Sequence, residues 1–393
     1  MEGKTILILG GGWGGLTAAH HLRGLLPSEH RVLVVERKDS YFLCPNLLWV
    51  MTGERRFPED VSRPMSKLSR QGIEWIHEEV QRIEPETRTI HTNARALQGD
   101  YLIIALGTEQ SPNSVPGFAE SAHNLYTGRG AVELQRFLSE FQKGRVAILI
   151  ARTPFRCPAA PYEAAFLADW LLRKRGVRGE VEISLFTPEK QPMPVAGRAV
   201  GEALRVMLTE RQIQYYPERT VSKIDGASHR LFFGSEEASY DLLIGVPPHK
   251  ASRLIEEAGL TDSTDYVPVH PQNLKILSDP STLETRFPGV FAIGDVTSIR
   301  LPNMMLLPKA GVFAEAEAAV VARIIASEIT GVPASGFDGR GFCYVDVGDG
   351  MAAFGSGNFY AYPSPSMTLE APSPRYRRDK EEFERVLESW FTR

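Results

Sequence analysis

Four residues near the N-terminus have the types and the spacing that bind a dinucleotide. Gly10, Gly12 and Gly15 form a GxGxxG motif between two apolar runs, and Glu36 ends the second run. The first glycine allows a tight turn, the second lets the backbone approach a pyrophosphate, and the third lets a helix lie close to a strand. The phosphates would rest at the positive end of that helix, and Glu36 would accept hydrogen bonds from a ribose hydroxyl.

Two more polar residues stand where a bound flavin would meet the chain. Asp295 ends the apolar run 287–296, and the C-terminal ends of strands are where α/β sheets bind ligands. It would hydrogen-bond the ribityl chain of FAD or, alternatively, cap the segment that follows. Lys309 precedes a predicted helix over 312–328, whose N-terminus would bring positive potential to a reduced isoalloxazine ring. The alternative for Lys309 is a solvated residue at a helix start.

The three cysteines, Cys44, Cys157 and Cys343, are too few and too scattered for a disulfide scaffold or a zinc cluster. In a reducing compartment, a disulfide among them would more often be catalytic than structural. Cys44 lies in an aromatic-rich segment, and we interpret it as a small buried hydrophobe.

Composition limits the class of protein. The formal net charge of -4 lacks the basic excess of a nucleic-acid-binding chain. No stretch approaches the roughly 18 to 20 apolar residues that span a bilayer. The first strand is expected from residue 5, which leaves no room for an export signal. We therefore expect a cytoplasmic protein, either soluble or peripheral on a membrane.

The pattern of strands and helices predicts an α/β fold with two Rossmann-like domains of the three-layer ββα type and a small C-terminal segment. The expected divisions are an FAD domain over 1–112 and 276–332, a second domain over 113–275, and a C-terminal segment over 333–393. The strand 146–150 starts the second domain, yet no glycine follows it before Gly176. Without small residues a backbone cannot approach a pyrophosphate, and Pro154 removes a donor. We infer that this domain has lost nicotinamide binding.

The C-terminal segment is predicted as a β-rich stretch to about 362, a loop over 363–374 and a terminal helix. One face of that helix is apolar, with hydrophobic residues spaced at i, i+3, i+4, i+7 and i+8. These are Phe383, Val386, Leu387, Trp390 and Phe391. Arg377, Arg378, Lys380 and Arg385 flank or share its polar side. The helix either docks on its own domain or lies in a membrane interface.

With these pieces in order, the chain resembles the sulfide:quinone oxidoreductase and flavocytochrome c sulfide dehydrogenase branch of the FAD disulfide-reductase superfamily. The resemblance covers nearly the whole length. It includes the glycine motif, the Phe291–Asp295 and Pro308–Gly311 segments, and a strand that closes on Gly107. Its specific part is the replacement of the second glycine motif by Cys157, with Glu163 six residues later and Cys343 near the end.

The resemblance implies a redox disulfide or polysulfide bridge between Cys157 and Cys343 beside FAD. Sulfide would attack one sulfur and two electrons would pass into the flavin, with Glu163 as a proton-transfer group and Gly107 in the flavin site. A thiolate is the nucleophile in such chemistry, and a nearby cation or helix N-terminus would lower its pKa. The substrate would be sulfide or a polysulfide, and the electron acceptor a membrane quinone.

Two features depart from the resemblance and leave rival interpretations open. Many quinone-linked members have a third cysteine where this chain has residues 124–127, and a histidine that is absent from 187–194. The first rival is therefore the flavin subunit of a sulfide dehydrogenase that passes electrons to a cytochrome. A type II NADH dehydrogenase shares the plan but conflicts with the glycine-free turn at 151–158. A flavin-binding redox sensor without turnover is the alternative from another class.

Overall fold

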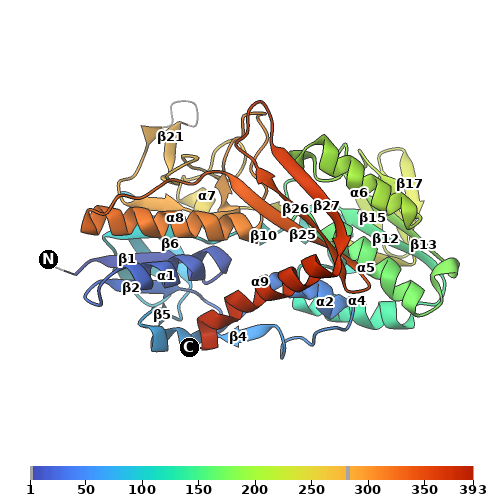
Figure 1. Cartoon of the computed structure of the whole chain (residues 1–393), viewed down its shortest axis with the longest axis horizontal. Coiled ribbons are helices and arrows are strands. Elements are labelled where there is room, and N and C mark those ends of the chain that lie inside the picture. The colour runs from blue at the N-terminus through green and yellow to red at the C-terminus, as the bar shows by residue number, and fades with distance from the viewer. Residues whose placement is uncertain (1–2, 280–283, 393) are drawn as a thin grey trace.

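The first part of the computed structural model is a five-stranded parallel sheet in the order β23-β9-β1-β2-β5 (Figure 1). The structure describes residues 3–279 and 284–392. The strands of this sheet are β1 (Thr5–Leu9), β2 (Arg31–Val35), β5 (Glu74–Ile76), β9 (Tyr101–Ile104) and β23 (Val290–Ala292). Helices α1 (Trp13–Leu25) and α8 (Gly311–Thr330) pack against each other, although residues 26–310 lie between them in the sequence. Their pairing brings the two ends of the predicted flavin site together.

The central strands of this sheet form because their side chains are buried on both faces. The sequences of β1 and β2, TILIL and RVLVV, have the continuous apolar character of parallel strands covered on both sides. A separate antiparallel meander consists of β6 (Val80–Glu84), β7 (Thr89–Thr92) and β8 (Ala96–Gln98). β5, which comes just before this meander in the sequence, is not part of it and pairs with β2 in the parallel sheet.

The second part is another five-stranded parallel sheet, in the order β11-β18-β12-β13-β14. Its strands are β11 (His123–Asn124), β12 (Gly144–Ile150), β13 (Val181–Phe186), β14 (Ile213–Tyr216) and β18 (Leu242–Val246). Its helices are α4 (Gly128–Glu140), α5 (Ala160–Lys174) and α6 (Arg198–Glu210). An antiparallel sheet of β15 (Lys223–Asp225), β16 (Arg230–Phe233) and β17 (Glu236–Ser239) completes it. Two Rossmann-like parallel sheets are thus present, as predicted.

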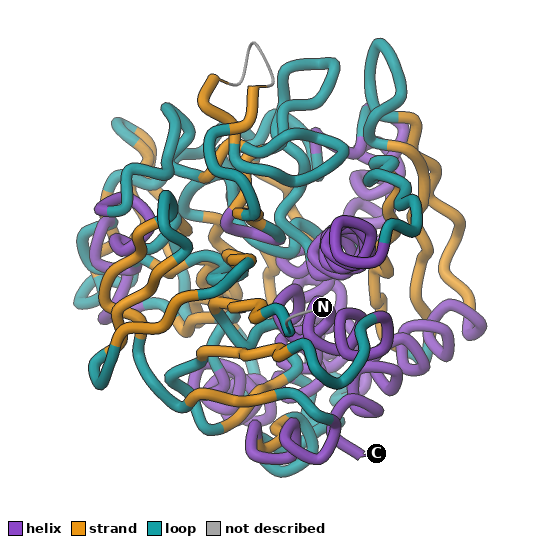
Figure 2. The backbone as a smooth tube through the Cα atoms, turned by 90° about the vertical axis from the view of Figure 1, so that its left-hand side faces the viewer, coloured by secondary structure: helices purple, strands orange, loops and turns teal. Residues whose placement is uncertain are grey.

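The C-terminal segment joins the two parts. Its antiparallel sheet consists of β25 (Arg340–Gly348), β26 (Met351–Asn358) and β27 (Ser366–Ser373), followed by α9 (Pro374–Thr392). β25 packs against α5 and β27 packs against α6, while α9 crosses back toward the first sheet (Figure 1). As a result, β1 begins and α9 ends at the same end of the molecule (Figures 1 and 2). The predicted loop over 363–374 is wrong, because most of it forms β27.

The chain returns to the first core earlier than predicted. Ala251, Ile255, Leu260 and Tyr266 are buried in the same core cluster as β1 and β9, before the expected boundary at residue 276. A short parallel pair, β20 (Val267–Pro268) with β24 (Thr297–Ser298), also attaches this stretch to the flavin-side segment.

The other short elements connect these parts. They are β3 (Ser40–Phe42), α2 (Leu47–Met51), β4 (Ser62–Pro64), β10 (Glu109–Gln110), α3 (Phe118–Ser121), β19 (His249–Lys250), α7 (Arg253–Glu257), β21 (Leu277–Asp279) and β22 (Glu284–Thr285). Among residues 3–279 and 284–392, none of the helices combines the length and the apolar character that crossing a bilayer requires.

Candidate active site

The glycine-rich turn between β1 and α1 has the geometry of a phosphate-binding loop. Gly10 has φ of 100°, a conformation that only glycine adopts readily. A Cβ at Gly15 would overlap the carbonyl oxygen of Gly10, whereas a Cβ at Gly12 would meet open space. The first turn of α1 carries no acidic side chain and no side-chain cap. The Glu36 carboxylate lies at the same loop and accepts the Gly11 N–H at 2.8 Å.

Asp295 and Lys309 lie together on the other side of this site. The Lys309 side chain is 4% exposed, and its Nζ donates to the carbonyl oxygens of Asp295 and Thr297 at 2.8 and 3.0 Å. Burial lowers the pKa of Lys309 to about 8. The alternative of a solvated lysine at a helix start is therefore wrong. Asp295 is also not a helix cap, because its buried Oδ1 has no hydrogen-bond partner among the described residues.

Cys157 lies in the loop that follows β12 and is held in an unusual backbone conformation. Its φ is 51°, in the left-handed region that side chains other than glycine seldom occupy. Its N–H donates to the Lys309 carbonyl at 2.6 Å, and its own carbonyl accepts the N–H of Ala160 at the start of α5. The loop of the second sheet is thereby attached directly to the segment before α8. Strained residues of this kind concentrate at functional sites.

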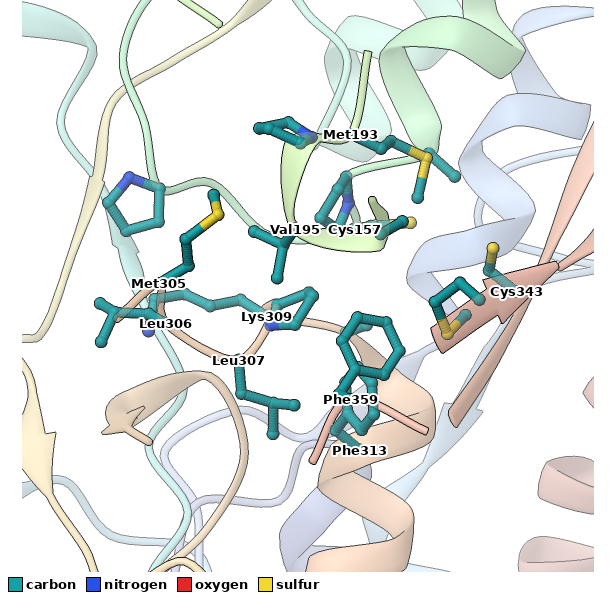
Figure 3. Close-up of a pocket in the computed structure, with 18 of the residues that line it drawn as sticks. Cys157, Met193, Val195, Met305, Leu306, Leu307, Lys309, Phe313, Cys343 and Phe359 are labelled. Atoms are coloured by element: carbon teal, nitrogen blue, oxygen red, sulfur yellow. The ribbon is translucent and has the colours of Figure 1, made fainter. Parts of the chain in front are cut away.

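Cys343 comes from β25 and lines the same cavity as Cys157, although the two residues are far apart in sequence (Figure 3). The cavity has a volume of about 410 Å³, and its walls are mainly apolar, with Met193, Met305 and Phe359 among them. Gly355 faces Cys343 across the sheet, and a Cβ there would lie 3.1 Å from the Cys343 Sγ. Both cysteines are free thiols in this structure.

Burial raises the pKa of both thiols to about 12, and the nearby negative charge of Glu163 adds to this effect. The sequence analysis expected a nearby cation or helix end to lower the thiol pKa. This expectation is wrong, because the pKa of each thiol is raised overall. The cavity disfavours a thiolate because it withdraws the sulfur from water. Lys380, on α9, is the nearby side chain that opposes this shift at both cysteines.

Glu163 lies in the first turn of α5 and is 3% exposed. One of its oxygens accepts the N–H of Asp346 at 2.8 Å and the Lys380 Nζ at 2.6 Å. Burial raises the pKa of Glu163, and the Lys380 charge acts in the opposite direction. Glu163 is thus buried as one half of an ion pair with Lys380. The sequence analysis did not predict this pairing.

Comparison with known proteins decides the family. A family model described as pyridine nucleotide-disulphide oxidoreductase matches residues 4–149 and 131–320. The chain belongs to this family. It is 27% identical to the sulfide-quinone reductase of Aquifex aeolicus, over 84% of this chain and 78% of that protein. It is 26% identical to the mitochondrial sulfide:quinone oxidoreductase of Dictyostelium discoideum, over 75% of this chain and 65% of that protein, just under two thirds of its length.

The fold agrees with the sequence relatives. The crystal structure of the sulfide:quinone oxidoreductase from Aquifex aeolicus superimposes with a TM-score of 0.87, covering 99% of this chain and 92% of that one at 23% identity. The chain is also 26% identical, over 93% of its length, to an alternative NAD(P)H-ubiquinone oxidoreductase of Arabidopsis thaliana.

Members of this pyridine nucleotide-disulphide oxidoreductase family are FAD-dependent oxidoreductases, and the residues of this chain fit the cofactor. The open space before Gly12 leaves room for a pyrophosphate at the N-terminus of α1. Two buried polar atoms without a partner among the described residues, Asp295 Oδ1 and Thr108 Oγ1, are suited to a polar ligand. Thr108 follows Gly107, whose φ is 65° and whose Cα faces open space.

Two predictions about single segments need correction. Cys44 is half-buried at the start of a short 3-10 helix and is not part of the apolar core, so its interpretation as a core residue is wrong. The described aromatic residues of α9 face the protein: Phe383 stacks on Trp13, and Phe391 is 2% exposed beside Tyr41. This packing favours the docked helix over the interfacial one. The side chains of Val386 and Leu387 lie outside the described residues.

The sequence interpretation missed three charged residues of α9 that point inward. Arg377, Lys380 and Glu384 are 7, 5 and 4% exposed. Their spacing of three and four residues places them on one helical face, which is the only signal the sequence carried. The sequence analysis assigns Arg377 and Lys380 only to the polar side of the helix, because their partners are far away in sequence. Glu189 was also missed: it lines the cavity, and burial raises its pKa to about 7.

Proposed function

We propose that this protein oxidises sulfide through a Cys157 and Cys343 pair and passes the electrons through FAD to a quinone. The observation that carries the proposal is the shared cavity, which is lined by a cysteine from the second sheet, a cysteine from β25 and the Lys309 segment. The relatives in Aquifex and Dictyostelium are a sulfide-quinone reductase and a sulfide:quinone oxidoreductase, which supports the choice of sulfide and quinone. A redox sensor without turnover would not require a cavity next to the thiol pair.

The proposed reaction begins from the oxidised pair. Hydrosulfide attacks one sulfur of the Cys157–Cys343 disulfide, so that a persulfide forms on that cysteine and the other leaves as a thiolate. Loss of two electrons and one proton then joins the thiolate to the persulfide and leaves a bridge longer by one sulfur atom. When bound, FAD would accept these two electrons and release them to the acceptor. The apolar walls exclude water and thus protect the persulfide from side reactions.

We propose that Glu163 accepts the proton that the persulfide releases. Its carboxylate lies close enough to both cysteines to affect their pKa values. Because burial raises its own pKa, it holds a proton more readily than an exposed glutamate. The backbone N–H of Asp346, which donates to it, fixes its orientation relative to β25.

The acceptor and the place of action remain part of the proposal. A quinone is favoured over a cytochrome because the relatives are named as quinone reductases. We propose that the protein acts on the cytoplasmic side of a membrane and binds it peripherally. The described part of α9 is a poor candidate for this contact, because its aromatic residues stack on Trp13, Tyr41 and His20.

The test is anaerobic titration with sulfide while the flavin absorbance is recorded. C157S and C343S should each retain bound FAD and lose flavin bleaching by sulfide, and the double variant should be no worse than either single one. C44S is the matched control, because Cys44 lies outside the cavity lining, and it should bleach like the wild type. Full bleaching in C157S or C343S would refute the mechanism.

A further inference from the structure

The C-terminal helix presents a charged face to the protein interior. Arg377, Lys380 and Glu384 are each less than 10% exposed. The partners of Arg377 and Lys380 lie on β25, on α5 and just after α2. Arg377 donates to Asp346 at 2.9 Å and to Glu54 at 2.6 Å. Isolated buried charges are strongly unfavourable, so a helix retains them only where partners are provided. This face is therefore a built ion network whose centre is the Lys380 pair with Glu163.

Lys380 is paired with Glu163, the residue proposed to accept the proton of the reaction. Its Nζ is 2.6 Å from the Glu163 carboxylate, and both side chains are almost completely buried. The indole ring of Trp49 lies 5.3 Å from the same ammonium group, and the Glu384 carboxyl group lies nearby. Burial raises the pKa of Glu384 to about 8. The net effect of these neighbours raises the pKa of Lys380, so the lysine stays protonated inside the protein.

We propose that Lys380 is a positioning residue for the Cys157 and Cys343 pair: it fixes the Glu163 carboxylate and stabilises an anionic sulfur in the apolar cavity. The inference rests on the proposed function, because it assigns the cation that the sulfur chemistry of that site requires. It also gives α9 a role in the chemistry. Lys380 is not among the residues that line the cavity, and we infer that it acts through its charge and through Glu163.

The electrostatics of the surroundings support this assignment. Burial and Glu163 raise the pKa of both thiols, whereas Lys380 lowers it at each of them. Other charged groups lie around Glu163 and Lys380 on α9 itself, on β25 and after α2. They are Arg377 and Glu384 on α9, Asp346 on β25, and Glu54 and Arg55 after α2. Two further cations lie on the other side of the cysteines: Arg156, next to Cys157, and Lys309, which lines the cavity. Of the cations in this group, Lys380 is the one that contributes to the pKa of both cysteines.

The experiment measures thiolate content directly, without turnover. Holoenzyme is reduced with a phosphine under anaerobic conditions and treated with iodoacetamide at pH 8, and alkylation of each cysteine is followed by mass spectrometry. K380M should slow alkylation of Cys157 and Cys343 about tenfold, the effect of one unit in a thiol pKa. K380R should restore the rate to within about threefold, because it retains the charge. R385M, at an exposed position of the same helix, should match the wild type.

A second comparison keeps the proposal testable if K380M fails to retain FAD. Alkylation in E163Q is compared with that in E163Q/K380M, where no buried carboxylate is left unpaired at this position. Slower alkylation in the double variant supports a direct effect of the Lys380 charge. Equal rates in that comparison, or a wild-type rate in folded K380M, would overturn the inference. Failure of the proposed function is separate, since it would appear as sulfide bleaching in C157S.

Discussion

Replacing Arg377 with methionine should release the C-terminal helix, because this guanidinium neutralises a fully buried carboxylate. Asp346 is 0% exposed and accepts hydrogen bonds from Arg377 at 2.9 Å and from the Trp49 indole N–H at 2.8 Å. The same guanidinium lies 4.3 Å from the Trp49 ring. Methionine keeps the apolar contact with that ring but leaves the Asp346 charge without its cation.

The expected loss in the free energy of unfolding of R377M is about 3 to 5 kcal/mol, the cost of removing one partner of a buried pair. Part of this loss should be recovered in D346N/R377M, where the Asp346 charge is removed together with its cation and the unmet hydrogen bonds cost about 1 to 3 kcal/mol. R385M removes an exposed arginine from the same helix and should change stability by no more than about 0.5 kcal/mol.

The assay is urea unfolding followed by tryptophan fluorescence. Trp49 reports on the release of the helix because its ring contacts the Arg377 guanidinium. Limited proteolysis of the C-terminal residues gives a second, local reading of helix release. A loss below about 1 kcal/mol in R377M, or a double variant less stable than the single one, would show that the network does not hold α9 in place.

Two further predictions concern the second sheet. NADH and NADPH should fail to bleach the flavin, because residues 151–158 lack glycine and Pro154 lacks an N–H; rapid bleaching by either at micromolar concentration would contradict this. Burial raises the pKa of Glu189 from 4.5 to about 7, so the folded state binds more protons than the unfolded state between these values and stability should fall as the pH rises through this window. E189Q should flatten this fall, as urea midpoints at pH 5 and pH 7.5 would reveal, and an unchanged slope would rule Glu189 out as its source.

The flavin half of the molecule was predictable because its signals are local. The glycine turn, the buried strands and Glu36 all lie within one βαβ unit, whose spacing reflects backbone geometry. Asp295 could be found in the same way, since it ends a buried strand. The boundary at residue 276 failed because the stretch around Ile255 and Tyr266 has no periodic pattern that reveals which core it joins.

The α9 network was not predictable because its partners are distant in sequence. Lys380 pairs with Glu163 across 217 positions, and Arg377 with Glu54 across 323. A helical period shows which side chains share a face, but it does not show whether that face meets water or protein. The spacing of the aromatic residues of α9 predicts an apolar stripe. The burial of the charged residues beside them depends on partners from β25, α5 and the segment after α2, which the sequence of α9 does not indicate.

The position of Cys157 depends on contacts that couple the two halves of the chain. A left-handed backbone costs a residue other than glycine roughly 1 to 2 kcal/mol. Two hydrogen bonds, to the Lys309 carbonyl and from the Ala160 N–H, are each worth about 0.5 to 1.5 kcal/mol and can offset that cost. One of them comes from the segment before α8. The backbone of Cys157 therefore depends on the docking of the flavin-side segment onto the second sheet, and we expect the proposed cysteine pair and the cofactor site to form together.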